Sequence, residues 1–127
     1  MRTVRAGEQV RKGRLAKARQ FSRVAEDAQL LADEGDTVAD AVVTLYIHAG
    51  IAASDAICAR ALGEHAKGEN HTDAVTLLRS VNQEGAKHLN RLLRMKTRAG
   101  YGHDPISKTQ LDQAKLAVDA LMEMANV

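Results

Sequence analysis

The spacing of apolar residues predicts two long helices in the first half of the chain. From Arg14 onward, apolar side chains recur at steps of three and four residues, as one face of a helix requires. We expect this helix to end at Gly35. Thr37, followed three residues later by Asp40, resembles a capping box, so a second helix is predicted from there to about residue 62, where Gly63 ends it.

Turn-forming residues divide the second half. A third helix is predicted from about Asp73, capped by Asn70 or Thr72. The span Ser80–Gly85 keeps the helical phase, so a kink within one helix and a turn between two helices both fit it. We favour a turn there.

A loop and one last helix complete the chain. After Arg98, two glycines and Pro105 fall within a few residues, which predicts a loop. Ser107 and Gln110 form a capping box for a final helix. The buried face of that helix carries Leu111, Ala114, Val118, Leu121 and Ala125.

The elements together predict an all-α protein, an antiparallel bundle of four to five helices. No linker or repeat divides residues 14–127, which we expect to form one domain. Residues 1–20 hold seven Lys or Arg against Glu8, so residues 1–13 are interpreted as a basic N-terminal arm. A contact with nucleic acid and a frayed, solvated terminus are both open for this arm.

Composition indicates the cellular compartment of the protein and whether it contacts a membrane. Cys58 is the only cysteine, which excludes an intramolecular disulfide, and no apolar run resembling a signal peptide opens the chain. We therefore expect a cytoplasmic protein. The apolar stretch from residue 38 to 62 contains Asp40, His48 and Asp55, which is too polar for a helix facing lipid. A core helix without membrane contact is predicted.

The second helix also carries a face of small residues, which allows another helix or a second subunit to approach closely. They are Ala49, Gly50, Ala52, Ala53 and Ala56. A homodimer through this face, or through the basic helix described next, is predicted. His48 and Asp55 lie on one side of the helix and could support a site, although satisfied core polar groups are the simpler alternative.

The most informative stretch runs from residue 85 to 103 and contains no acid. Lys87, Arg91, Arg94 and Arg98 fall at i, i+4, i+7 and i+11, so a helix would align them in one basic stripe leading to Tyr101 and His103. Such a stripe fits a phosphate backbone, with Tyr101 placed to stack on a base. A solvated helix face without a ligand is the competing explanation.

The segments YIHAGIAASDAI (residues 46–57) and MKTRAGYGHDPIS (residues 95–107), with the bundle around them, resemble small bacterial HEPN-domain proteins. The resemblance implies an Arg-x4-6-His motif before the last helix, which Arg98 and His103 match. It further implies a homodimer that joins two motifs, metal-independent ribonuclease activity on RNA, and a toxin acting with an antitoxin or nucleotidyltransferase partner protein. Two departures are Ala99, where the family commonly has Asn, Asp or His, and Pro105, where some members have a modified tyrosine.

In this interpretation His103 is the general base and Arg98 stabilises the charge on the reacting phosphate. Arg60 and His65 have the same Arg-x4-His spacing, so the spacing alone is weak evidence for a catalytic site. The histidines of the loop after residue 63 lack the spacing of structural metal sites, and neither a metal nor another cofactor is expected. The alternative function is a catalytically inactive HEPN-like module that binds nucleotides or proteins.

Overall fold

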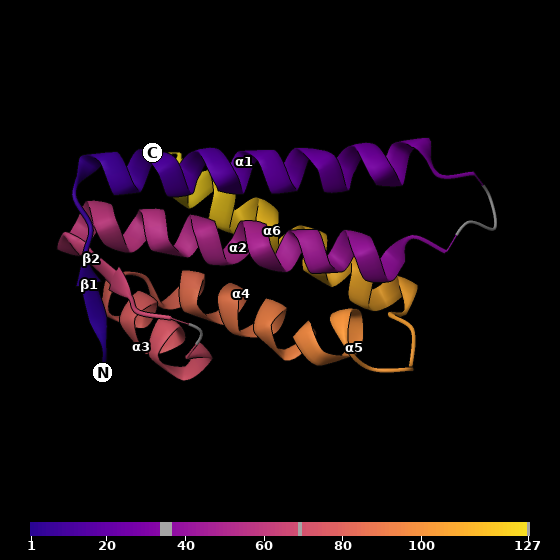
Figure 1. The fold of residues 1–127 in the computed structure, drawn as a ribbon. Helices are drawn as coiled ribbons and strands as arrows, with labels where there is room; N and C mark the ends of the chain where they lie inside the picture. The colour runs from indigo at the N-terminus through magenta and orange to yellow at the C-terminus, as the bar shows by residue number, and fades with distance from the viewer. Residues whose placement is uncertain (34–36, 69, 127) are drawn as a thin grey trace.

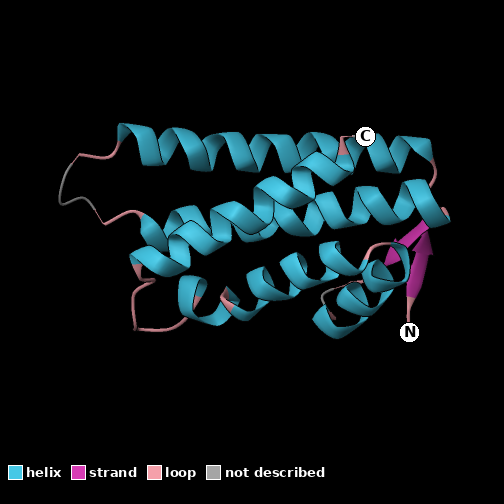
Figure 2. Ribbon diagram, turned by 180° about the vertical axis from the view of Figure 1, so that it is seen from behind, coloured by secondary structure: helices cyan, strands magenta, loops and turns pink. Residues whose placement is uncertain are grey.

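The computed structural model describes residues 1–33, 37–68 and 70–126, and these form an all-α helical bundle (Figure 1). Helices α1 (Glu8–Leu31) and α2 (Ala39–Leu62) make a long antiparallel hairpin. Beside α2 lie α3 (His71–Val81), α4 (Gln83–Arg94) and the five-residue α5 (Lys96–Gly100). The last helix, α6 (Lys108–Ala125), packs against α2 and α4 and runs diagonally across the face of the bundle that Figure 2 turns toward the viewer. The described residues thus confirm the predicted all-α bundle.

Helix α2 is the centre of the core. Its buried side chains run from Val42 to Ala59 and meet α1, α3, α4 and α6. By length and composition alone α2 could cross a membrane, but two thirds of its most apolar window, 67%, is buried inside the bundle. The small-residue face predicted to join two subunits is also buried, so the interface expected there is wrong. That face instead receives the neighbouring helices of the same chain.

Helix ends were largely predictable from local sequence. Gly63 ends α2 with φ of 70°, a left-handed conformation that suits glycine. Asn70 caps α3 by accepting from the Asp73 N–H at 3.0 Å, and Ser107 and Gln110 form the predicted capping box of α6. Asn82 ends α3 and also caps α4, accepting from the Gly85 N–H at 2.8 Å. The predicted turn between residues 80 and 85 is therefore confirmed.

The start of α2 differs from the prediction. Its N-cap is Val38, without a side-chain cap, so Thr37 and Asp40 do not form a capping box. The Asp40 carboxylate instead accepts a hydrogen bond from the Ile106 N–H at 2.8 Å. A long-range partner has thus replaced the local one, and it ties the loop before α6 to the start of α2. The helix end predicted at Gly35 lies outside the described residues.

The N-terminal residues are more ordered than an arm. Strand β1 (Thr3–Arg5) pairs antiparallel with β2 (Glu64–Ala66), with Val4 opposite His65. Helix α1 begins at Glu8, six residues before the predicted start at Arg14. Residues 1–13 are therefore shared between β1 and the first turns of α1, and no separate arm precedes the bundle.

Candidate functional site

A basic groove lies between α4 and α6. It has a volume of about 380 Å³, and its polar lining comes from Lys87, Asn90, Arg91, Arg94, Gln110 and Gln113. Three of the four cations predicted to align on one stripe are thus brought together, because i, i+4 and i+7 fall on one face of α4. The described lining contains no carboxylate. Amide and guanidinium donors on such a wall suit phosphate oxygens.

The groove is open to solvent, and its charges are only weakly compensated. Lys87 forms an ion pair with Glu84 at 3.1 Å, with both side chains mostly exposed. Exposed pairs of this kind contribute little free energy and compete weakly with a ligand. Arg91 and Arg94 are exposed at the end of α4 and have no carboxylate partner at ion-pair distance among the described residues. Both guanidinium groups are therefore accessible to an anionic ligand.

The predicted motif, Arg98 and His103, lies outside the lining of the groove. Arg98 belongs to α5 rather than to the start of a loop, because that helix continues to Gly100. Its guanidinium donates weakly to the Pro105 carbonyl, at 3.4 Å. The His103 side chain is 97% exposed, and its Nε2 lies 3.7 Å from an Asp104 oxygen. Tyr101 is also exposed, at 79%.

Arg98 and His103 are therefore near in sequence but not assembled into one contact. The described residues contain no hydrogen bond or ion pair that joins them. Arg98 does not line the groove of the other three cations. The acid-free surroundings predicted for His103 are also incomplete, because Asp104 lies beside its ring. A single chain thus presents a basic surface and an exposed imidazole rather than a closed catalytic site.

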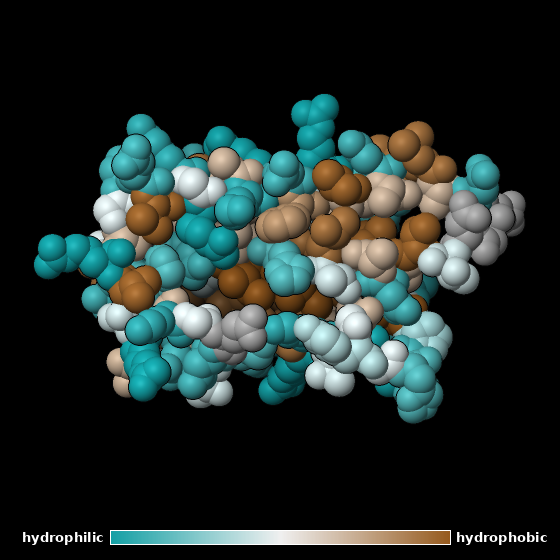
Figure 3. Space-filling model, viewed as in Figure 1, coloured by the Kyte–Doolittle hydropathy of each residue, from teal (hydrophilic) through white to brown (hydrophobic). Residues whose placement is uncertain are grey.

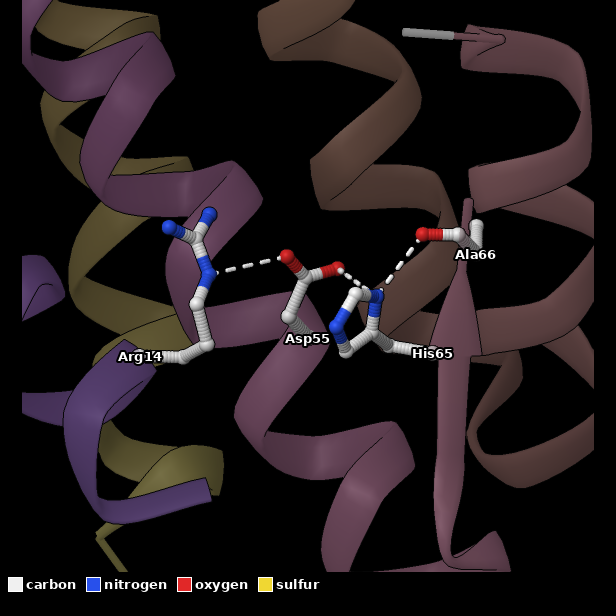
Figure 4. A network of polar contacts seen from close by, with 4 residues as sticks. All are labelled: Arg14, Asp55, His65 and Ala66. Atoms are coloured by element: carbon white, nitrogen blue, oxygen red, sulfur yellow. Dashed lines mark hydrogen bonds and ion pairs between the residues drawn. The ribbon is translucent and has the colours of Figure 1, made fainter. Parts of the chain in front are cut away.

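The two residues predicted to support the site lie elsewhere. Asp55 accepts from the Arg14 Nε at 3.0 Å, and its second oxygen is 3.9 Å from the His65 Nδ1 (Figure 4). Burial raises the pKa of the Asp55 carboxyl, and the positive charge of Arg14 opposes that rise, as does His65 when its ring is protonated. This network joins α1, α2 and β2. No hydrogen bond or ion pair among the described residues links it to Arg98 or His103.

His48 and His65 have local partners of their own. His48 is exposed on α2, and its ring centroid lies 5.8 Å from that of Phe21. The His65 Nδ1 is 2.7 Å from the Ala66 carbonyl oxygen, so this nitrogen carries the proton. Arg60, the other half of the second spacing match, lines a different, largely apolar cavity with Val81 and Met124. Arg60 and His65 therefore do not form one site.

Sequence reasoning missed one partly open cavity of about 200 Å³ among α1, α2, α3, α5 and the residues around β2. Its lining includes His48 and Asp55, together with Arg14, His71 and Lys96. These residues are up to 82 positions apart in sequence (96 − 14), so no local pattern could have grouped them. Within the described part of the chain, no group of three or more His, Cys, Asp or Glu side chains could hold a metal ion.

Comparison with known proteins adds no assignment, since no family model and no curated sequence matches the chain. The class defined by fold and site is an all-α bundle that carries a basic groove beside an exposed arginine and histidine.

Proposed function

We propose that the protein is a metal-independent endoribonuclease of the HEPN type that works as a homodimer in the cytoplasm, with Arg98 and His103 as catalytic residues. The observation that carries this proposal is the acid-free groove formed by Lys87, Arg91 and Arg94, which ends near the helix that bears Arg98. A nucleic-acid backbone is the polyanion that such a row of cations binds.

The chemistry follows from the two side chains. An unprotonated His103 would take the proton of a ribose 2′-hydroxyl, and the resulting oxygen would attack the adjacent phosphorus. Arg98 would stabilise the additional negative charge on the phosphate oxygens. The 5′-oxygen leaves with a proton, and the products are a 2′,3′-cyclic phosphate and a free 5′-hydroxyl. One chain supplies one imidazole, so an acid for the leaving group needs a second motif.

A homodimer supplies that second motif. The exposure of His103 leaves its ring accessible to a partner subunit and to RNA. Large apolar side chains are also exposed along the C-terminal half of α1, at Val24, Leu30 and Leu31, and Figure 3 shows apolar surface over the face formed by α1 and α2. Light scattering should report about twice 13.7 kDa. A monomer at assay concentration would contradict the two-motif mechanism.

The decisive experiment incubates the purified protein with mixed RNA in EDTA. Cleavage with cyclic phosphate ends is expected from the wild type. His103→Ala should lower the rate about 10²–10⁴-fold, the usual contribution of a general base. His65→Ala is the matched control, because His65 lies in the Arg14–Asp55 network, and it should change the rate by less than about tenfold. A larger loss in a folded His65→Ala protein would refute the assignment.

A second function, an inactive HEPN-like module that binds nucleotides or a protein, is favoured by the absence of an Arg98–His103 contact among the described residues. Ala99, buried in α5, gives the motif no additional polar group. This candidate predicts RNA or nucleotide binding without cleavage. If cleavage is found, an adjacent gene for an antitoxin or nucleotidyltransferase would identify the expected partner protein of a toxin pair.

A further inference from the structure

The partly open cavity of about 200 Å³ contains an ammonium group with little compensating negative charge nearby. Lys96, the first residue of α5, is partly buried, and its Nζ lies 3.2 Å from the Nε2 of His71. An ammonium group only donates hydrogen bonds, so the Nε2 of His71 is the acceptor in this contact. No carboxylate of the described residues lies within ion-pair distance of Lys96. The cavity therefore contains a positive charge that no counter-ion in the described protein neutralises.

Arg14 adds a second cation at the same place. Its Nε is engaged with Asp55 at 3.0 Å, while its two terminal nitrogens point away from that carboxylate (Figure 4). Asp55 is the only acid among the described lining residues, and its charge is compensated by Arg14. Among the described lining residues, two cations and one carboxylate leave an excess of one positive charge. The terminal guanidinium nitrogens are available to donate to a further group.

The remaining lining suits a small ligand. Ile51, Ala66 and Ala74 provide apolar surface beside the polar groups. A volume of about 200 Å³ has room for a phosphate group and several waters, each of which takes about 30 Å³ in the liquid. The cavity also has about half the volume of the α4–α6 groove, and its walls come from segments far apart in the chain. Those dimensions favour a small molecule over a continuous nucleic-acid strand.

We propose that this cavity is a binding site for a small phosphate-bearing molecule, either inorganic phosphate or a small phosphate monoester, held by Lys96 and Arg14. The negative charge of a phosphate group would offset the excess positive charge of the cavity, and its oxygens would accept hydrogen bonds from both side chains. The apolar surface at Ile51, Ala66 and Ala74 would accommodate the organic part of an ester. This site is separate from the groove and from Arg98 and His103, so the proposal can be tested independently of ribonuclease activity.

The test is calorimetric titration of the full chain with inorganic phosphate, and in a second arm with glycerol phosphate, at ionic strength matched with chloride. Binding with a dissociation constant in the millimolar range or tighter is expected. Lys96→Gln should weaken it at least about tenfold, and Lys96→Arg should retain it because the charge remains. Tighter binding of the ester than of free phosphate would assign the ligand to the organic class, and the reverse result to the free ion.

Two matched controls separate this site from other basic surfaces. Lys108→Gln removes an exposed lysine of α6 that pairs with Asp112 and does not line the cavity, and it should leave phosphate binding unchanged. Arg91→Gln removes a cation of the groove, so it should leave the phosphate binding that depends on Lys96 unchanged. If Arg91→Gln abolishes binding while Lys96→Gln does not, phosphate binds in the groove and the proposal is wrong. Absence of millimolar binding by the wild type would also overturn it.

An NMR titration provides a readout that does not depend on how Lys96→Gln folds. Phosphate added to the wild type should shift the imidazole resonances of His71, which lines the cavity, and leave in place those of the exposed His103, which does not line it. His71→Gln identifies the resonance. A shift confined to His103 would place the anion at the motif loop and refute the cavity site.

Discussion

Gly50 offers the sharpest test of how α2 is packed. It lies in the middle of α2, and a Cβ atom placed there would be 2.4 Å from the Leu92 Cδ1 and 3.5 Å from the Leu121 Cδ1. Carbon atoms pack best at about 3.5–4.0 Å, so Leu92 would have to move by about 1 Å. Leu92 is fully buried, and its neighbours leave little room for that movement. Gly50→Ala should therefore strain the core.

The magnitude follows from a comparison with Gly13. Gly13 lies inside α1, and a Cβ atom there would meet nothing within 4 Å. Both Gly→Ala changes gain helix propensity, about 1 kcal/mol each, and this gain cancels between them. Overpacking costs about 1–3 kcal/mol at Gly50 alone. The free energies of unfolding of the two variants should therefore differ by about 1–3 kcal/mol, with Gly13→Ala the more stable.

Urea unfolding followed by circular dichroism measures both values. A third variant, Leu92→Ala, should lose about 2–5 kcal/mol in the wild-type background and less when combined with Gly50→Ala, since the new methyl group fills part of the space left by Leu92. Equal stabilities of Gly50→Ala and Gly13→Ala, or additive losses in the double variant, would refute the close approach of α2 and α4.

Three further predictions concern charge and reactivity. Burial raises the pKa of the Asp55 carboxyl above its ordinary value of 3.8, so its contribution to stability is complete below that pH and is lost as pH rises through the folded-state pKa. The Tm difference between wild type and Asp55→Asn should therefore fall as pH rises from 3.8, and a constant or rising difference would contradict this sign. Burial, with the nearby charge of Asp55, raises the pKa of the Cys58 thiol to about 12. Iodoacetamide at pH 8 should therefore modify the folded protein about 10³-fold more slowly than the urea-unfolded chain, and rapid labelling of the native protein would show the thiol to be accessible. Arg91→Ala and Arg94→Ala should each reduce by about 1 the slope of the logarithm of the RNA-binding constant against the logarithm of the salt concentration. Lys108→Ala should leave that slope unchanged, and equal effects of all three variants would assign binding to diffuse charge.

The parts of the fold that the sequence predicted are those encoded within a few residues. The end of α2 at Gly63 and the caps at Asn70 and Ser107 depend on side chains adjacent to the helix termini. The basic wall of the groove was predictable for the same reason, because the spacing of Lys87, Arg91 and Arg94 along α4 places them on one face.

The features that were missed depend on pairings across the chain. The opposite wall of the groove comes from α6, and β1 finds its partner in β2, some sixty residues later. Asp40 has good local capping chemistry, yet it accepts from the Ile106 N–H, since tertiary contacts override a local preference. The cavity around Lys96 and His71 likewise arises only when α3 and α5 pack together.

The junction at Asn82 restricts how the chain could change in length. This one residue ends α3 and starts α4, so no spare backbone separates the two helices. An inserted residue that extended α4 at this point would turn the rest of that helix by about 100° about its axis. Lys87, Arg91 and Arg94 would then face away from α6, and Leu89 and Leu92 would leave the core. Insertions are better accommodated between α5 and α6, where the exposed residues 101–105 provide a longer connection.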